Sequence, residues 1–506
     1  MKKIISFFLC VILLASVSAS AAESAFNKED FMKTKSYYSE IIKKEINYVK
    51  SLVLPNGAIV MNALAISPYS GLVLPTINGI EPSVYKSWGS GKVMPYFSSF
   101  AALGVIRGAE TLGITDGKDE VLSYINWYIT HMNTKESDVN GLKNTVYDYF
   151  MFKNPKTNEV IELTLYDAYA SQFPQNNPHD YDSTDSYAAI FLELLYEYTR
   201  VFDNTFMNGK AELVESLLNV IFGTYIDQLG LTGSKPNYMI AYLMDNCEVY
   251  KGMMAAYKIY TEFLNDSYAA ANAQKYADII KKSLLDGFWQ SNDKAFTAAV
   301  DEKGKACYGT SAEDMKNFYP QQTAQLFPVI FDLLDPKDQK AVYVYDGFNK
   351  VFGITGERGH NWVTLDKGDT FPWAMISCCA VKMGDLERAN KFLNNVYLRY
   401  IKSAGHPYPY HNAEAGHILT TATMLYNIAE DDPVVSEPIS EPISEPISEP
   451  NNVSIPQSEN DSAAETSNTI KTENNSKWKV VAAIIAGVAI VGTAVILLLK
   501  KKKTKK

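Results

Sequence analysis

Residues 183–231 read STDSYAAIFLELLYEYTRVFDNTFMNGKAELVESLLNVIFGTYIDQLGL, and the pattern in this stretch decides the fold. Apolar residues recur every three or four positions over 183–204 and again over 209–231, which predicts two amphipathic helices. The link between them is only a few residues long, and such links favour antiparallel packing. This stretch is therefore predicted to form one helical hairpin.

The same periodicity extends over residues 26–430 and predicts twelve helices. We expect them at 28–52, 93–114, 116–133, 183–204, 209–231, 239–264, 267–288, 320–335, 337–353, 370–383, 385–403 and 413–430. Links within a pair are short, whereas several links between pairs are long. Short β-structure is expected only near 147–152, 160–165 and 295–300.

Alternating short and long links predict an all-α fold, an (α/α)6 toroid of six helical hairpins with short β insertions. The even-numbered helices are the more apolar and should form the inner ring, while the odd-numbered ones carry a polar stripe and should form the outer ring. An open α-solenoid would need a fixed repeat period, and the sequence has none. In the toroid, all the long links enter inner helices at their N-termini, where we expect a site.

The N-terminal residues 1–22 have the three parts of a secretory signal. Lys2 and Lys3 precede a short apolar run, and Ala19-Ser20-Ala21 supplies small residues for cleavage. We therefore expect the mature chain to begin with the helical domain, residues 23–430, outside the cell.

The C-terminal part predicts a stalk and a membrane anchor. Residues 431–477 include Ser-Glu-Pro-Ile repeats, whose prolines and repelling glutamates favour an extended stalk. Residues 478–499 include an uncharged apolar run long enough to span a bilayer. The lysines of 500–506 place that end in the cytoplasm, so a single-pass protein at the cell surface is expected, with the membrane contacted through 478–499.

Composition excludes several classes of protein. The chain has 506 residues, 47% of them hydrophobic, so a large core is available and disorder is not the default. Its net charge of −10 disfavours nucleic acid as a partner. The four cysteines beyond the signal form neither a disulfide framework nor a metal-binding spacing. We expect no cofactor.

Acidic and aromatic side chains gather where the fourth helix begins. Asp182 and Asp185 are three positions apart and would share one helix face, stabilised as anions by the helix dipole. Such a pair suits a base, a nucleophile or an acceptor for sugar hydroxyls, and both are predicted to be catalytic. Asp180 and Tyr181 are predicted to contact the substrate. Helix capping by these residue types is the alternative.

Two further acids lie among apolar or aromatic neighbours. Glu81 lies close to Trp88, and burial there would raise the pKa of its carboxyl, as a general acid requires. Asp148 lies between Tyr147 and Tyr149 and is predicted, like Trp88, to contact the substrate. The alternatives are a solvated loop glutamate and an exposed strand aspartate.

Residues able to stack on sugars or to hydrogen-bond to their hydroxyls recur at the other inner-helix entrances. Those predicted to contact the substrate are Tyr96, Tyr319, Gln322, Trp373, His411 and Glu414. The series His411, Glu414, His417 has a spacing that invites a zinc interpretation. The two histidines are six positions apart and cannot share one helix face with Glu414, so no metal is predicted.

Several of these stretches resemble the six-hairpin glycosidase-like superfamily, and most nearly its bacterial surface members related to glycoside hydrolase family 8. The resemblance covers about residues 30–430 and is carried by DYDSTDSYAA at 180–189, Tyr147 to Tyr149, Tyr319 to Gln322, and Glu414 to His417. It implies an (α/α)6 toroid with a carbohydrate site across the inner-helix entrances. Family 8 signatures around the acid and base are not found.

The leading hypothesis is a membrane-anchored extracellular glycoside hydrolase that cleaves a poly- or oligosaccharide with paired carboxyl groups. Glu81 is the expected acid, and Asp182 or Asp185 the expected base. Two alternatives remain open. One is a polysaccharide lyase, and the other is a glycan-binding or adhesive surface module without catalysis on the same scaffold.

Overall fold

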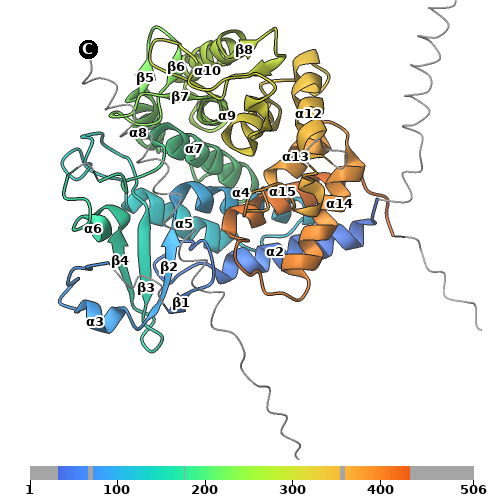
Figure 1. Ribbon diagram of the computed structural model, residues 1–506. Coiled ribbons are helices and arrows are strands. Elements are labelled where there is room, and N and C mark those ends of the chain that lie inside the picture. The colour runs from blue at the N-terminus through green and yellow to red at the C-terminus, as the bar shows by residue number, and fades with distance from the viewer. Residues whose placement is uncertain (1–31, 67–71, 176, 354–358, 433–506) are drawn as a thin grey trace, which may run out of the picture. The chain divides into compact units, whose positions relative to one another are not determined.

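The computed structural model describes residues 32–66, 72–175, 177–353 and 359–432 (Figure 1). The predicted signal at 1–22, almost all of the stalk and the apolar run at 478–499 lie outside these residues. In the described ranges, no helix is long and apolar enough to cross a membrane.

Six helices form a closed inner ring. They are α4 (Pro95–Leu112), α7 (Thr184–Val201), α9 (Leu243–Ile259), α11 (Phe327–Ile330), α13 (Met375–Lys382) and α15 (Asn412–Ile428). Each contacts the next in this order, and α15 returns to contact α4. The predicted toroid, with the even-numbered segments inside, is therefore confirmed by the chain's own packing.

Six further helices lie outside the ring. They are α2 (Lys35–Ser51), α5 (Lys118–Thr130), α8 (Ala211–Phe222), α10 (Ser267–Gly287), α12 (Gln339–Phe352) and α14 (Leu386–Val396). Helix α2 packs on α15 and α4, α5 on α4, α8 on α7, α10 on α9, and α14 on α13 and α15. The described ranges also contain single helical turns: η1 (Tyr260–Leu264), η2 (Asp314–Lys316), η3 (Phe318–Gln322), η4 (Trp362–Thr364) and η5 (Tyr397–Ile401).

The predicted helix at 320–335 is wrong as one continuous element. The chain forms the turn η3 and then the short helix α11. Proline has no N–H to donate to a helix and clashes with the preceding turn, and this segment contains Pro320 and Pro328. This segment, the eighth of the twelve expected helices, is consequently the least regular part of the toroid.

The β-structure is more extensive than expected. Strands β1 (Ala65–Ile66), β2 (Gly89–Val93), β3 (Tyr149–Lys153) and β4 (Val160–Thr164) form one antiparallel sheet in that order. The β-structure expected near 147–152 and 160–165 is confirmed, and the two strands pair with each other. Strand β2 reads Gly-Ser-Gly-Lys-Val, which has little intrinsic β-propensity, and it is extended because it pairs on both sides.

The sheet lies beside the helices, with α3 (Pro82–Tyr85) and α6 (Leu165–Tyr169) next to it (Figure 1). It has its own core, which includes Tyr85, Trp88 and Phe152 and is separate from the main core between the helices. Two-stranded sheets complete the fold: β5 (Tyr225–Ile226) with β6 (Leu231–Thr232), β7 (Ala241–Tyr242) with β10 (Ala299–Val300), and β8 (Trp289–Gln290) with β9 (Ala295–Phe296).

Small residues allow the inner helices to approach closely. A Cβ at Gly104 of α4 would lie 2.5 Å from Gly416 Cα of α15, and one at Gly252 of α9 would lie 2.6 Å from Ala189 Cα of α7. These distances are shorter than van der Waals contact, so glycine is required at both crossings.

A network of charged side chains connects the inner helices farther from their N-termini. Arg107 of α4 donates to Glu193 of α7 at 2.8 Å and to the hydroxyl of Thr420 of α15 at 3.1 Å. Asp332, just after α11, accepts from Lys251 of α9 at 2.7 Å and from Lys382 of α13. Every inner helix is therefore joined to a neighbour by a charged hydrogen bond.

Candidate active site

Carboxyl groups gather at the start of α7 and α9. Asp182 precedes α7, Asp185 lies in its first turn, and Asp245 and Glu248 lie at the start of α9, while Asp148 precedes β3. We call these five residues the carboxyl cluster. Helices α7 and α9 are neighbours in the inner ring. Their N-termini therefore supply most of the cluster from two adjacent elements.

Asp185 is fully buried and held by several donors. Its Oδ1 accepts from Ser183 Oγ at 2.6 Å and from the Ser186 N–H at 2.9 Å, and its Oδ2 accepts from Thr232. Burial raises the pKa of Asp185 to about 6, although these hydrogen bonds oppose the rise. The side chain that caps α7 is Ser183, which accepts from the Ser186 N–H.

Asp182 is exposed, in contrast to Asp185. Its own backbone N–H faces the Tyr187 hydroxyl at 3.5 Å. Asp182 directly precedes Ser183, whose Oγ lies 2.6 Å from Asp185 Oδ1 and 3.3 Å from Asp245 Oδ2. Asp182 is therefore the open, solvent-facing member of the cluster.

The two acids of α9 have raised pKa values. Burial, then repulsion from Asp185, Glu248 and Asp182, raises the pKa of Asp245 well above its ordinary value. Burial also raises the pKa of Glu248 to about 8, with Asp185 and Asp182 adding to the rise. Glu248 is almost completely buried, whereas Asp245 is partly exposed. Asp245 is thus the proton-bearing carboxyl that a ligand can reach.

Tyrosines surround the cluster. The Tyr187 hydroxyl donates to Asp148 Oδ1 at 2.9 Å, and the Tyr96 hydroxyl donates to Glu248. The rings of Tyr96 and Tyr187 stack with centroids 5.9 Å apart. Burial raises the pKa of Asp148 to about 6, and the Lys92 ammonium, 4.0 Å from its Oδ2, limits that rise.

The entrances of α13 and α15 contribute a second group of residues. Glu414 of α15 accepts from the backbone N–H groups of Trp373 and Ala374 at 2.9 and 2.7 Å, so it caps α13. Burial raises the pKa of Glu414 to about 7. The Trp373 ring lies 5.4 Å from the ring of Tyr319, a residue that is 55% exposed.

His411 lies next to Glu414 and is buried. Its Nε2 is 3.9 Å from Glu414 Oε1, and its ring stacks on Phe97 at 4.8 Å. Burial lowers the pKa of His411 to about 4. Among the described residues, no group of three His, Cys, Asp or Glu side chains is arranged to hold a metal ion.

Several predicted site residues lie together. Asp148, Asp182, Asp185 and Tyr96 meet at the carboxyl cluster. Burial, followed by the charges of Asp182 and Asp245, raises the pKa of Tyr319. Tyr319 in turn contacts Trp373.

Three further predicted site residues have their side chains outside the carboxyl cluster, although the backbone oxygen of Asp180 accepts from the Asp148 N–H at 3.1 Å. Glu81 is exposed before α3, so the expected burial is wrong; its apolar neighbours Ile80 and Trp88 pack into the sheet's core. Asp180 is paired with Lys235 at 2.7 Å. The Tyr181 hydroxyl accepts from Asn140 at 2.7 Å. These two residues stabilise the loop before α7.

Asp245 and Glu248 were missed in the sequence. They lie in Leu-Met-Asp-Asn-Cys-Glu-Val-Tyr at 243–250, three positions apart at the start of an inner helix. Asp182 and Asp185 were found because the same spacing occurs among other acids and tyrosines. A search for paired acids at every inner-helix entrance would have found this second pair.

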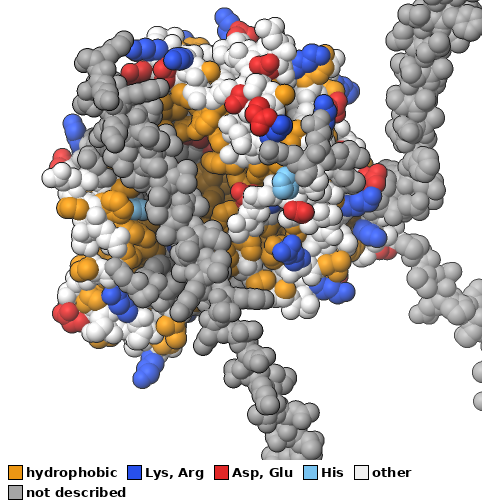
Figure 2. Space-filling model, in the orientation of Figure 1, with side chains coloured by type: hydrophobic (Ala, Val, Ile, Leu, Met, Phe, Trp, Pro, Cys, Tyr) orange, Lys and Arg blue, Asp and Glu red, His pale blue; other side chains and the backbone are white. Residues whose placement is uncertain are grey.

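One face of the molecule has a predominantly hydrophobic centre. Figure 2 shows hydrophobic side chains gathered in the middle of this face, while most lysines, arginines and acids lie toward its margins.

No protein-family model and no curated protein matches this chain. Several solved structures are similar to it. D-mannose isomerase has 11% identity and a TM-score of 0.48, with 80% of this chain and 100% of that chain covered. A cold-adapted family 8 xylanase in complex with substrate has 12% identity and a TM-score of 0.43, with 77% and 93% covered. An inactive variant of an alpha-1,6-mannanase of Salegentibacter sp. HEL1_6, in complex with alpha-1,6-mannotriose, has 12% identity and a TM-score of 0.44, with 77% and 99% covered. The fold assignment itself rests on the ring of helix contacts described above.

Proposed function

We propose that this chain is a glycoside hydrolase that cleaves an oligo- or polysaccharide at the carboxyl cluster. One observation supports this most strongly: the exposed Asp182 precedes Ser183, whose Oγ lies 3.3 Å from the partly exposed carboxyl of Asp245, and burial together with neighbouring acids raises the pKa of Asp245. Glycoside hydrolysis requires one carboxyl group that donates a proton and another that activates water or attacks the sugar. The two groups here have the opposite environments that these roles need.

In this proposal Asp245 is the general acid. It donates its proton to the glycosidic oxygen as the bond from that oxygen to the anomeric carbon breaks. Asp182 accepts a proton from the water that adds to the anomeric carbon. Asp245 replaces Glu81 as the acid because Glu81 is exposed and lies beside the separate core of the sheet.

Other residues position these two groups and the sugar. Asp185 and Glu248 surround Asp245 with carboxyl groups and favour its protonated form. The rings of Tyr319 and Trp373 offer flat faces on which a sugar ring can stack. Acids make up the cluster and tyrosines surround it. The cation Lys92 is paired with one of these acids, Asp148. These surroundings favour a neutral sugar over a uronate, which a lyase would need to hold.

We propose further that the domain acts outside the cell, anchored by residues 478–499. The support is the sequence: a charged and apolar signal at 1–22 and an uncharged run followed by lysines. Protease treatment of intact cells should remove the domain and leave a short membrane-bound fragment. Full protection from the protease, with digestion only after lysis, would contradict this topology.

A product screen tests the catalytic proposal. The protein is incubated with neutral, acidic and amino-sugar glycans, and products are identified by mass. We expect new reducing ends, lost in Asp182→Asn and kept in Asp227→Asn, a matched change at an exposed aspartate on the β5–β6 hairpin. An unsaturated uronate product would indicate a lyase. Saturable binding without any product would indicate a glycan-binding module.

A further inference from the structure

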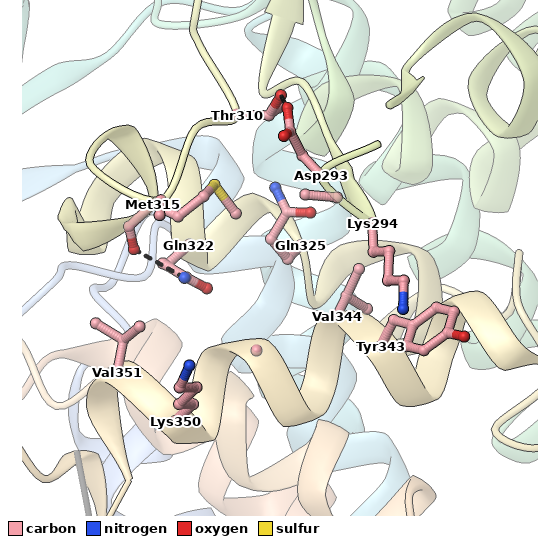
Figure 3. Close-up of a pocket in the computed structure, with 13 residues that line it drawn as sticks. Asp293, Lys294, Thr310, Met315, Gln322, Gln325, Tyr343, Val344, Lys350 and Val351 are labelled. Carbon is pink, nitrogen blue, oxygen red and sulfur yellow. Dashed lines mark hydrogen bonds between the residues drawn. The ribbon is translucent and has the colours of Figure 1, made fainter. Parts of the chain in front are cut away.

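A pocket of about 370 Å³ lies between α12 and the segment that follows β8 (Figure 3). None of the residues that line it belongs to the carboxyl cluster. They come from residues 293–295, 310–315 and 322–325 and from one face of α12. Ligand sites have volumes of roughly 300–1,000 Å³, so this pocket is large enough for a small ligand.

A buried hydrogen-bond acceptor in the pocket has no partner. Gln322 is 2% exposed, and its Nε2 donates to the backbone oxygen of Met315 at 2.8 Å. A carbonyl oxygen can only accept, so this bond fixes the orientation of the amide and leaves Oε1 on the other side. Within the described part of the chain, Oε1 has no donor, and Figure 3 shows it directed toward the middle of the pocket.

The remaining polar groups of the lining offer both signs of charge. Thr310 donates to Asp293 at 2.6 Å, and the Lys294 ammonium lies 4.4 Å from the centre of the Tyr343 ring. Lys350 lines the pocket from α12 (Figure 3). The lining thus presents amide and carboxylate acceptors together with the Lys294 ammonium as a donor, over an apolar wall that includes Val344.

We infer that this pocket binds a small neutral carbohydrate, a mono- or disaccharide, at a site separate from the carboxyl cluster. A hydroxyl group both donates and accepts, so one sugar can donate to Gln322 and Asp293 and accept from Lys294. A phosphate or carboxylate group cannot donate to Gln322 Oε1 and would be repelled by Asp293. An apolar ligand would leave the buried acceptor unpaired.

The test is ligand-observed NMR on the full chain in a detergent without a sugar headgroup. The probes are glucose, xylose, mannose, galactose and their β-1,4-linked or α-1,6-linked disaccharides. We expect saturable binding of at least one probe, with a Kd on the order of 1 mM, as for a single small polar pocket.

Two variants locate the binding. A Cβ at Gly347 of α12 would meet nothing within 4 Å, so Gly347→Leu fills the pocket without a backbone clash. It should weaken binding at least about tenfold, or about 1.4 kcal/mol. Gln322→Met removes the acceptor at similar volume and should weaken binding several-fold. Gln339→Leu, at an exposed position of the same helix, is the matched control and should bind normally.

The outcomes separate this site from the carboxyl cluster. Binding should persist in Asp182→Asn, and glycan hydrolysis should persist in Gly347→Leu. Absence of saturable binding by every probe would overturn the inference. So would binding that survives Gly347→Leu but disappears when Asp182 is changed, since the signal would then come from the cluster.

Discussion

Asp182 and Asp185 lie three positions apart, and the fold gives them opposite surroundings. Asp185 is buried among donors from Ser183, Ser186 and Thr232, whereas Asp182 is exposed. The spacing of the pair and its place at an inner-helix entrance were predictable from sequence. Which of the two is open to a ligand was not, because the donors to Asp185 include Thr232, from a different hairpin.

The difference predicts separable effects of two substitutions. Asp182→Asn should lower kcat/KM by about 10²–10⁴-fold, the usual contribution of a general acid or base, with little change in melting temperature. Asp185→Asn replaces an acceptor that satisfies three donors and should cost about 1–3 kcal/mol of stability. Steady-state kinetics and thermal unfolding of both variants check this. A large stability loss in Asp182→Asn would indicate a structural role instead.

Buried carboxyls also predict how stability depends on pH. The pKa values of Glu414 and Glu248 are about 7 and about 8, both above the ordinary glutamate value. Above about pH 6.5 the folded chain keeps protons that the unfolded chain has already released, so stability falls as pH rises. His411 and His417, with pKa values of about 4 and about 3, act in the opposite direction and only below about pH 6.5.

The melting temperature should therefore fall between about pH 6.5 and 8. Glu248→Gln removes one of the titrating groups. It should therefore reduce the loss of unfolding free energy over this pH interval by about 1–2 kcal/mol. Thermal unfolding of both proteins across that range measures the slope. Equal slopes would show that Glu248 does not hold its proton in the folded chain.

Where two helices cross closely, the space between their backbones determines which residue can occupy the contact position. Gly104 of α4 faces Gly416 of α15, and an added Cβ there would lie 2.5 Å from backbone. Gly347 of α12, in contrast, has open space around the position of a Cβ. Both are glycines within predicted helices, and the sequence alone did not distinguish them, because the distinction depends on a helix more than 300 positions away.

Alanine substitutions at these two glycines should change the stability of the chain in opposite directions. Gly104→Ala should destabilise the chain by about 1–3 kcal/mol, since α4 and α15 must separate. Gly347→Ala adds helix propensity and should be neutral or stabilising by up to about 1 kcal/mol. Chemical denaturation of both variants is the measurement. Similar effects at the two sites would contradict the close contact of α4 with α15.

Element boundaries were predictable where periodicity is uninterrupted and less so near prolines. Helices α4, α7 and α10 lie within the ranges expected for them. The 320–335 segment was misjudged because its apolar pattern continues across Pro320 and Pro328. Strand β2 was missed because its residues are extended by pairing with β1 and β3 rather than by their own propensity.

At the scale of the whole molecule, link lengths were enough to predict the toroid. Short links define the hairpins, and closure of the ring follows from α15 packing on α4. The charged network that joins the inner helices was not predictable, because its members are single residues on separate hairpins. Its centre is Arg107 with Glu193, a carboxylate that is nearly buried.

Removing one partner of the Arg107–Glu193 pair should lower the stability of the fold. Arg107→Met leaves the Glu193 carboxylate without its cation and should lower stability by about 3–5 kcal/mol. The double variant with Glu193→Leu should recover much of that loss, because no buried charge remains. A double-mutant cycle by chemical denaturation measures the coupling. Additive losses would show that the pair is screened by solvent and does not link α4 to α7.

The most direct test of the proposed chemistry compares substrates with poor and good leaving groups in the Asp245→Asn variant. A general acid matters when the departing oxygen must be protonated and matters little when the leaving group departs as a stable anion, as fluoride does. We predict that Asp245→Asn loses about 10²–10⁴-fold in kcat/KM on a natural glycoside and retains most of its activity on the corresponding glycosyl fluoride. Equal losses on both substrates, or no loss on either, would contradict the role of Asp245 as the general acid.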